Sequence, residues 1–307
     1  IGLVGSEMCI RDRAITYSFI FGAMFGDVGQ GLVLFLGGLF LYKTKKMDLA
    51  GIISCAGVFS VFFGFMYGSF FGFEDVLKAI WLKPMNQMMD VPLVGRLNAV
   101  FVIAIGFGMF IILICMVFNI INSIRRGDTE KTWFDSNAVA GLVFYGSIVL
   151  TIGLFISGKK LPAAAILVIM FGVPLLLMFL KEPLTNLVEK KSEILPEQKG
   201  MFFVQSFFEL FEVLLSYLSN TLSFLRIGAF AVSHAAMMEV VLMLAGATNG
   251  GSPNWVVVVL GNIFVCAMEG LIVGIQVLRL EYYEIFSRFY AGNGREFKPF
   301  MKAAHKN

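Results

Sequence analysis

The sequence predicts an all-α integral membrane protein with about eight transmembrane helices, of which the last two are long and strongly tilted. Of its 307 residues, 58% are apolar and only 15% are charged, the mean hydropathy is +0.83, and the apolar residues form long blocks between short charged loops. Soluble domains carry about 25% charged residues, whereas about 20 apolar residues in a helix cross a bilayer. The composition therefore excludes an ordinary soluble domain, and a net charge of +3 gives no reason to expect nucleic-acid binding.

Seven apolar blocks follow one another, at about 14–42, 49–73, 97–122, 134–157, 161–180, 201–245 and 255–286. The first block contains the glycine-rich segment Gly26–Gly31 at its centre, which weakens a continuous span and suits a turn. We therefore expect a helical hairpin over 14–42. Asp27 could bind an ion or cap a helix N-terminus, and we favour the cap. Residues 14–180 then hold membrane helices one to six, and the crossings number eight.

The first residues, IGLVGSEMCIRDR, fit neither a signal peptide nor a membrane span. The string GSEMCIRDR resembles translated sequencing-adapter DNA, so we expect residues 1–13 to be a non-native leader without function.

Lysine and arginine placement predicts the orientation, because cytoplasmic loops carry the excess of these residues. They gather in 43–48, 123–133, the loop 181–200 and the tail from Arg288. We expect these segments and both termini of the membrane domain to be cytoplasmic. Segments 74–95, 158–160 and 246–254 would lie outside.

Residues 201–300 are expected to form two long tilted helices that line an ion path, followed by a cytoplasmic C-terminal tail. A helix over 201–245 would be about 70 Å long, roughly twice the thickness of the hydrocarbon core. It must tilt, bend or begin on the membrane surface. The 255–286 block continues without a helix breaker, so it is also overlong.

Polar side chains of the first long helix fall within about 120° of one another, and they are Glu209, Glu212, Ser216, Ser219, Ser223, Arg226, Ser233 and His234. Serines alone are typical of hydrogen bonds between packed helices. Arg226 is different, because a charge deep in a span costs about 2.5 kcal/mol or more and marks a functional site. His234 is either functional or a hydrogen-bonded packing residue.

The last block repeats this pattern at a spacing of seven residues, with Asn262, Glu269, Gln276 and Tyr283 on one face. Glu269 lies in mid-span, so we expect it to be neutral, paired with an arginine or in contact with a water-filled cavity. Arg279, Glu281 and Glu284 approach the cytoplasmic end, where water would solvate them. The remaining candidates for a polar path are Glu212, Ser219, Ser223, Ser233, Asn262 and Gln276.

Two further patterns point to structure rather than chemistry. The glycines of 57–72 recur every four to seven residues, which is typical of close helix packing. The four cysteines form no CxxC pair and no cluster with histidine, so neither a metal site nor a disulfide framework is expected.

Four stretches resemble signature sequences of the membrane stator subunit of V-type rotary ATPases, and they read FGAMFGDVGQG, GVFSVFFGFMYGSFFG, SFLRIGAFAVSHA and MEGLIVGIQVLRLEYYEIFSRFYAGNGREFKPF. This family is called subunit a in eukaryotes and subunit I in bacteria and archaea. The resemblance covers about residues 14 to 300, which correspond to the family's C-terminal membrane domain. It implies eight helices, the last two facing a ring of proteolipid rotor subunits that each carry one carboxylate.

The resemblance also implies roles for single residues. Arg226 would meet the rotor carboxylates, Glu269 and Arg279 would line the ion path, and His234 matches a family histidine on the same helix. The sequence departs from some members at Gln30 and Gln276, where they carry histidine, so neither position is expected to be essential for proton transfer.

The function expected from these features is that of a stator subunit, which provides the ion half-channels for H⁺ or Na⁺ translocation and is not an enzyme on its own. No cofactor is expected. The expected partners are the proteolipid rotor ring, the peripheral stalk subunits reached through an N-terminal cytosolic domain that this chain lacks, and the lipid of a prokaryotic cell membrane. The alternative is an ion-coupled secondary transporter, which predicts internal repeats; we find none between the first and last four expected spans.

Overall fold

The computed structural model describes residues 8–73, 76–84, 88–91, 95–127, 129–159, 163–188, 199–247 and 253–289. Its helices are α1 Met8–Met24, α2 Val28–Lys45, α3 Asp48–Tyr67, α4 Ala99–Arg126, α5 Thr129–Trp133, α6 Val139–Ile156, α7 Ala164–Phe179, α8 Lys181–Val188, α9 Lys199–Ser223, α10 Leu225–Leu244, α11 Trp255–Leu280 and α12 Ser287–Phe289. A π-helical turn, Glu281–Phe286, joins α11 to α12. The expected tail beyond residue 289 and residues 189–198, which are half of the 181–200 loop, lie outside the described residues.

The part of the chain that the structure describes is nearly all α-helical, with one exception. Strands β1 Met88–Val91 and β2 Gly95–Asn98 pair antiparallel in the segment that joins α3 to α4. The all-α expectation missed this hairpin because strands of four residues are too short to show a period-two pattern. Asn98 then caps α4, its side chain accepting from Val100 N at 3.0 Å.

The first apolar block contains a break at Phe25–Asp27, where the sequence predicts a turn. α2 begins directly after Asp27, whose side chain accepts from Gln30 N at 2.9 Å, so the predicted cap is confirmed. α3 packs along both α1 and α2. At this contact a Cβ atom on Gly57 would lie 2.5 Å from Phe35 N, and one on Gly64 would lie 2.4 Å from Val28 N. The glycines therefore do serve close helix packing, as their spacing predicts.

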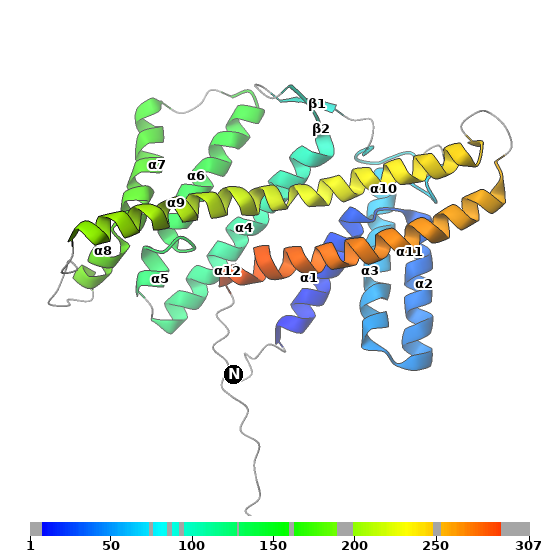
Figure 1. Ribbon diagram of the computed structural model, residues 1–307, viewed down its shortest axis with the longest axis horizontal. Helices are drawn as coiled ribbons and strands as arrows, with labels where there is room; N and C mark the ends of the chain where they lie inside the picture. The colour runs from blue at the N-terminus through cyan, green and yellow to red at the C-terminus, as the bar shows by residue number, and fades with distance from the viewer. Residues whose placement is uncertain are drawn as a thin grey trace, which may run out of the picture.

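The helix predicted over 201–245 is divided into α9 and α10 at a single residue, Phe224. Here the backbone N–H groups donate to carbonyls three residues earlier, Phe224 N to Thr221 O and Ile227 N to Phe224 O, as in a 3₁₀ turn. Phe224 keeps helical angles, φ −70° and ψ −18°, so the two helices run nearly in line across the molecule (Figure 1). Its buried ring fits against Gly108 of α4, where a Cβ would lie 2.3 Å from it.

The α9–α10 rod lies at a steep angle to α2, α3 and α7, and α11 returns beside α10 in the opposite direction (Figure 1). The main hydrophobic core lies between this pair and α1, α3, α4 and α6. Many large apolar side chains are nevertheless exposed, for example Phe40 and Leu271. Such a surface suits lipid or membrane partners rather than water.

Five helical segments among the described residues are long and apolar enough to cross a membrane, or six if α7 and α8, bent by 73°, count as one. The α9–α10 rod is one of the five and contains 45 residues. α1 and α2, at 17 and 18 residues, are not among them. The structure thus supports a multi-pass membrane protein, while eight crossings and a tilt of the last helices in a bilayer remain predictions.

Candidate functional site

Two polar clusters lie between α10 and α11, at different levels of the rod. Because α10 and α11 are antiparallel, His234 of α10 lies beside Glu269 of α11. Arg226, at the start of α10, lies instead near Glu284 in the π-helical turn that follows α11. His234 follows Arg226 by eight residues in the sequence, which is about 12 Å along a helix. The two clusters are therefore separate. We call His234 and Glu269 the first station, and Arg226, Ser223 and Glu284 the second station.

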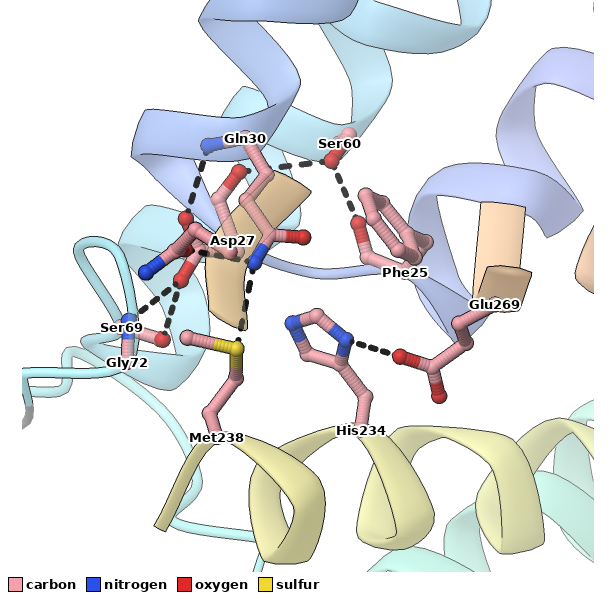
Figure 2. A network of polar contacts seen from close by, with 10 residues as sticks. Phe25, Asp27, Gln30, Ser60, Ser69, Gly72, His234, Met238 and Glu269 are labelled. Atoms are coloured by element: carbon pink, nitrogen blue, oxygen red, sulfur yellow. Dashed lines mark hydrogen bonds and ion pairs between the residues drawn. The ribbon is translucent and has the colours of Figure 1, made fainter. Parts of the chain in front are cut away.

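The first station is a buried ion-pair candidate. His234 Nδ1 and Glu269 Oε2 are 2.6 Å apart, and the residues are only 3% and 1% exposed (Figure 2). Phe25 covers the imidazole, with ring centroids 4.7 Å apart. Of the three expectations for Glu269, pairing with an arginine is not met: its partner is a histidine, because α10 brings His234 and not Arg226 to its level. A neutral Glu269 or contact with water remains a prediction.

Each member of this pair keeps one free polar atom. His234 Nε2 and Glu269 Oε1 are buried and have no hydrogen-bond partner among the described residues. A cavity of about 20 Å³ next to His234 is lined by Gly26, Tyr67, Ser69, Gly72, Pro84, Ala231, Ala235 and Met238. That volume holds about one water molecule, and the lining includes the segment between α3 and β1.

Asp27 holds that segment in place. Its Oδ1 accepts from Gln30 N at 2.9 Å and Phe71 N at 3.0 Å, and its Oδ2 accepts from the Ser69 hydroxyl at 2.6 Å and Gly72 N at 3.0 Å (Figure 2). The buried carboxylate thus ties the start of α2 to residues 69–72. Its role here is structural.

Gln30 extends this network to the long helices. Its Nε2 donates to Asn262 Oδ1 at 2.9 Å and lies 3.2 Å from Met238 Sδ. Of the candidate path residues, Asn262 is therefore buried and held by α2. Gln30 and Asn262 form a polar link between the helical hairpin and α11.

The second station is centred on Arg226, at the start of α10. Arg226 is half-buried, and its Nη2 donates to the Ser223 hydroxyl at 3.2 Å. The same hydroxyl donates to Glu284 Oε1. Arg226 Nη1 is buried without a hydrogen-bond partner among the described residues. The guanidinium group is therefore anchored on one side only.

Glu281 and Glu284 were expected to be solvated near the end of the helix, and the structure contradicts this. They are 1% and 6% exposed, because the π-helical turn directs both inward. Glu281 accepts from the Thr16 hydroxyl of α1. Arg288, the first residue of the expected tail, lies in α12 and is 7% exposed, with Nη1 donating to Asn137 Oδ1 at 3.0 Å.

Arg288 lies beyond the last candidate span, in α12. Burial lowers the pKa of its guanidinium group, and the nearby Tyr217, Tyr145, Cys115 and Glu284 oppose that shift. Its carbon Cζ lies 6.0 Å from the centre of the Tyr217 ring. This cation is thus part of the protein interior.

The other predicted residues do not gather at a station. Arg279, Glu212, Ser219 and Ser233 are exposed, and Gln276 is half-buried. Glu209 pairs with Lys181 of α8, outside the candidate path. The polar face predicted for the long helix is therefore divided. Glu212, Ser219 and Ser233 are exposed, whereas His234 is buried with Glu269. Sequence reasoning expected water to solvate Glu284, because nothing in the residues around it indicates burial.

A cavity of about 880 Å³ lies between α1, α2, α3 and α11 and has an almost entirely apolar lining. Neither Arg226 nor the His234–Glu269 pair lines it, so it is separate from both stations. No group of three histidine, cysteine, aspartate or glutamate side chains suited to a metal ion occurs within the described residues.

Comparison with known proteins shows which proteins this chain resembles. Residues 180–302 match the model of the V-type ATPase 116kDa subunit family. The A-type ATP synthase subunit I of Aeropyrum pernix is 28% identical over 327 residues, which cover 93% of this chain and 46% of the relative. The subunit of the same name from Pyrococcus horikoshii is 27% identical, with 94% and 42% covered, and the V-type ATP synthase subunit I of Borreliella burgdorferi is 25% identical, with 95% and 50% covered.

The resemblance predicted from the four motifs is therefore confirmed, and it extends over most of the chain. The chain spans about half of the length of these relatives, or less.

Proposed function

We propose that this chain, a relative of the A-type and V-type ATP synthase subunit I proteins, is the membrane stator part of a rotary ATPase or ATP synthase. In this role it carries H⁺ or Na⁺ between the membrane surfaces and a rotor ring. ATP hydrolysis or synthesis takes place on other subunits. The proposed partners are the proteolipid rotor ring, the peripheral stalk and the surrounding lipid of a cell membrane.

The observation that carries the proposal is Arg226 itself, a half-buried arginine whose Nη2 donates to Ser223 and for which no carboxylate forms an ion pair among the described residues. A charged side chain in a membrane needs a partner or water, and here the neighbouring surface of α9 is exposed at Ser219. A carboxylate on an adjacent rotor helix would balance the charge of this partly exposed side chain.

The proposed mechanism follows from electrostatics. A rotor carboxylate faces lipid only when H⁺ or Na⁺ neutralises it, because a bare charge in hydrocarbon is too costly. When it reaches Arg226, the positive charge favours its ionised form, so the ion leaves. Arg226 also blocks direct passage of cations between the two sides.

The two stations suit two offset half-channels. The His234–Glu269 pair neighbours the one-water cavity beside residues 69–72, which belong to the side expected to be outer. The exposed Arg279 lies at the other level, near Arg226. Ions entering at one station can leave at the other only by travelling with the ring.

Replacement of Arg226 tests this proposal. In the assembled complex we expect Arg226→Ala to abolish ATP-driven ion uptake into reconstituted vesicles while leaving assembly intact. Arg226→Lys should also fail, by about tenfold or more, because a compact ammonium group does not reproduce the planar donor fork. Arg125→Ala, at an exposed arginine at the end of α4, is the control and should transport normally. Normal uptake by Arg226→Ala would refute the proposal.

A further inference from the structure

Glu284 is a buried carboxylate outside the proposed ion path. Its Oε1 accepts a hydrogen bond from the Ser223 hydroxyl. The Ser223 hydroxyl oxygen in turn accepts from Arg226 Nη2 at 3.2 Å. A hydroxyl group donates one proton and still accepts another. Ser223 can therefore bridge the two charged groups in a single proton arrangement, from the guanidinium to the hydroxyl to the carboxylate.

The Glu284 carboxylate also lies within electrostatic reach of a second cation. It attracts both Arg226 and Arg288. Arg288 is fixed by Asn137 and the Tyr217 ring, with its Nε and Nη2 buried and without hydrogen-bond partners among the described residues. Arg279 also lies within electrostatic reach of Arg226. Three cations and one carboxylate therefore leave a net positive charge. Arg288 therefore takes part of the Glu284 charge that would otherwise neutralise Arg226.

The local backbone brings Glu284 to this position. The turn Glu281–Phe286 is π-helical, a conformation that is rare and often occurs at functional sites. Glu281 and Glu284 point inward from it while Tyr282 and Tyr283 remain exposed. Glu281 contacts Thr16 of α1 and Glu284 contacts Ser223 of α9, so one turn connects the last helix to two others.

We propose that Glu284 is a positioning residue for Arg226: through Ser223 it fixes the guanidinium group at Nη2, and its negative charge limits how strongly Arg226 attracts a rotor carboxylate. A direct Arg226–Glu284 pair would cancel the attraction, and an isolated Arg226 would hold the rotor carboxylate ionised too firmly. With the Ser223 hydroxyl between them, Glu284 weakens the attraction of Arg226 for the rotor carboxylate without cancelling it. This inference rests on the proposed role of Arg226.

The variant Glu284→Gln tests it, because the amide keeps an acceptor for Ser223 and loses the charge. In the assembled complex, Arg226 should then hold the rotor carboxylate ionised more strongly. The apparent affinity for the transported ion should fall by about threefold or more, so that a higher H⁺ or Na⁺ concentration is needed for half-maximal ATP-driven uptake. Glu284→Asp keeps the charge and should shift the ion dependence less. Glu239→Gln, at an exposed glutamate of α10, should leave it unchanged.

A purely structural role for Glu284 predicts a different result, namely less assembled complex with an unchanged ion dependence per complex. That outcome overturns the inference. If Arg226→Ala is inactive at the same time, the proposed function survives. If Arg226→Ala transports normally, the proposed function is refuted and the inference with it.

If the complex with Glu284→Gln fails to assemble, the variants Ser223→Ala and Ser223→Thr test the inference. Ser223→Ala removes the bridge and should lower the uptake rate per complex, whereas Ser223→Thr keeps the hydroxyl and should restore it. Wild-type uptake rates in both variants would overturn the inference.

Discussion

Glu269 is the residue of the proposed path that we expect to exchange ions, and His234 is its partner. Glu269 lies in a helix long enough to span the membrane, and its only hydrogen-bond partner in the described part of the chain is His234. A carboxylate that exchanges ions requires a neighbour that can share a proton or a charge, and imidazole is suited to this role. Glu269 Oε1 and His234 Nε2 are buried and have no hydrogen-bond partner among the described residues.

Neutralising Glu269 is expected to cut ATP-driven ion uptake by about tenfold or more, because Glu269→Gln removes a group that exchanges protons or ions. Glu269→Asp keeps the carboxylate and should retain part of the transport. The measurement is initial uptake by vesicles that hold equal amounts of assembled complex. If Glu269→Gln transports at the wild-type rate, Glu269 is a structural hydrogen-bonding residue and the half-channel lies elsewhere.

Sequence reasoning could find Arg226, His234 and Glu269 as single residues, because ionisable groups inside long apolar blocks stand out. It could not find the His234–Glu269 pairing, since these residues are 35 positions apart and meet only through the antiparallel contact of α10 and α11. Nor could it find that Glu284 is buried, since a helix end usually meets water and the π-helical turn has no strong sequence signal.

Helix packing at the element scale depends on glycine in the α2–α3 pair. A Cβ atom on Gly38 would lie 2.7 Å from Ser54 N and 2.9 Å from Ala50 O, both backbone atoms of α3. Neither can move without displacing the helix. The adjacent Gly37 faces open space, with nothing within 4 Å.

We therefore expect Gly38→Ala to destabilise the protein by about 1–3 kcal/mol through overpacking. Gly37→Ala, its matched control, should be neutral or slightly stabilising, because alanine favours a helix over glycine by about 1 kcal/mol. The thermal unfolding midpoint of the detergent-solubilised complex distinguishes the two. Equal midpoints for both variants would show that α2 and α3 do not pack through Gly38.

Element boundaries could largely be predicted, because apolar blocks and caps are local features. The turn at Phe25–Asp27 and the cap by Asp27 are examples. The interruption of the long helix at Phe224 could not, because it accompanies a tertiary contact between this ring and Gly108 of α4. The β1–β2 hairpin was missed because its strands contain only four residues each.

The whole molecule joins a bundle of shorter helices to one rod of 45 residues and its antiparallel neighbour (Figure 1). The sequence could predict this division from block length alone. The side of the rod that meets a rotor depends on which polar residues stay exposed after packing. The exposed row at Ser219, Ser233 and Arg279, next to Arg226, identifies the proposed rotor face.

The central claim is that this face meets a proteolipid ring, and disulfide cross-linking in the assembled complex tests it most directly. In a complex without other cysteines, Ser219→Cys is paired with a cysteine one helical turn from the rotor carboxylate, and Phe40→Cys on α2, 69% exposed, is the control. We predict that the ring co-purifies with the chain and that Ser219→Cys forms a reducible stator–rotor cross-link, whereas Phe40→Cys does not. A chain that purifies without a ring, or that cross-links through Phe40→Cys and not through Ser219→Cys, would contradict the account.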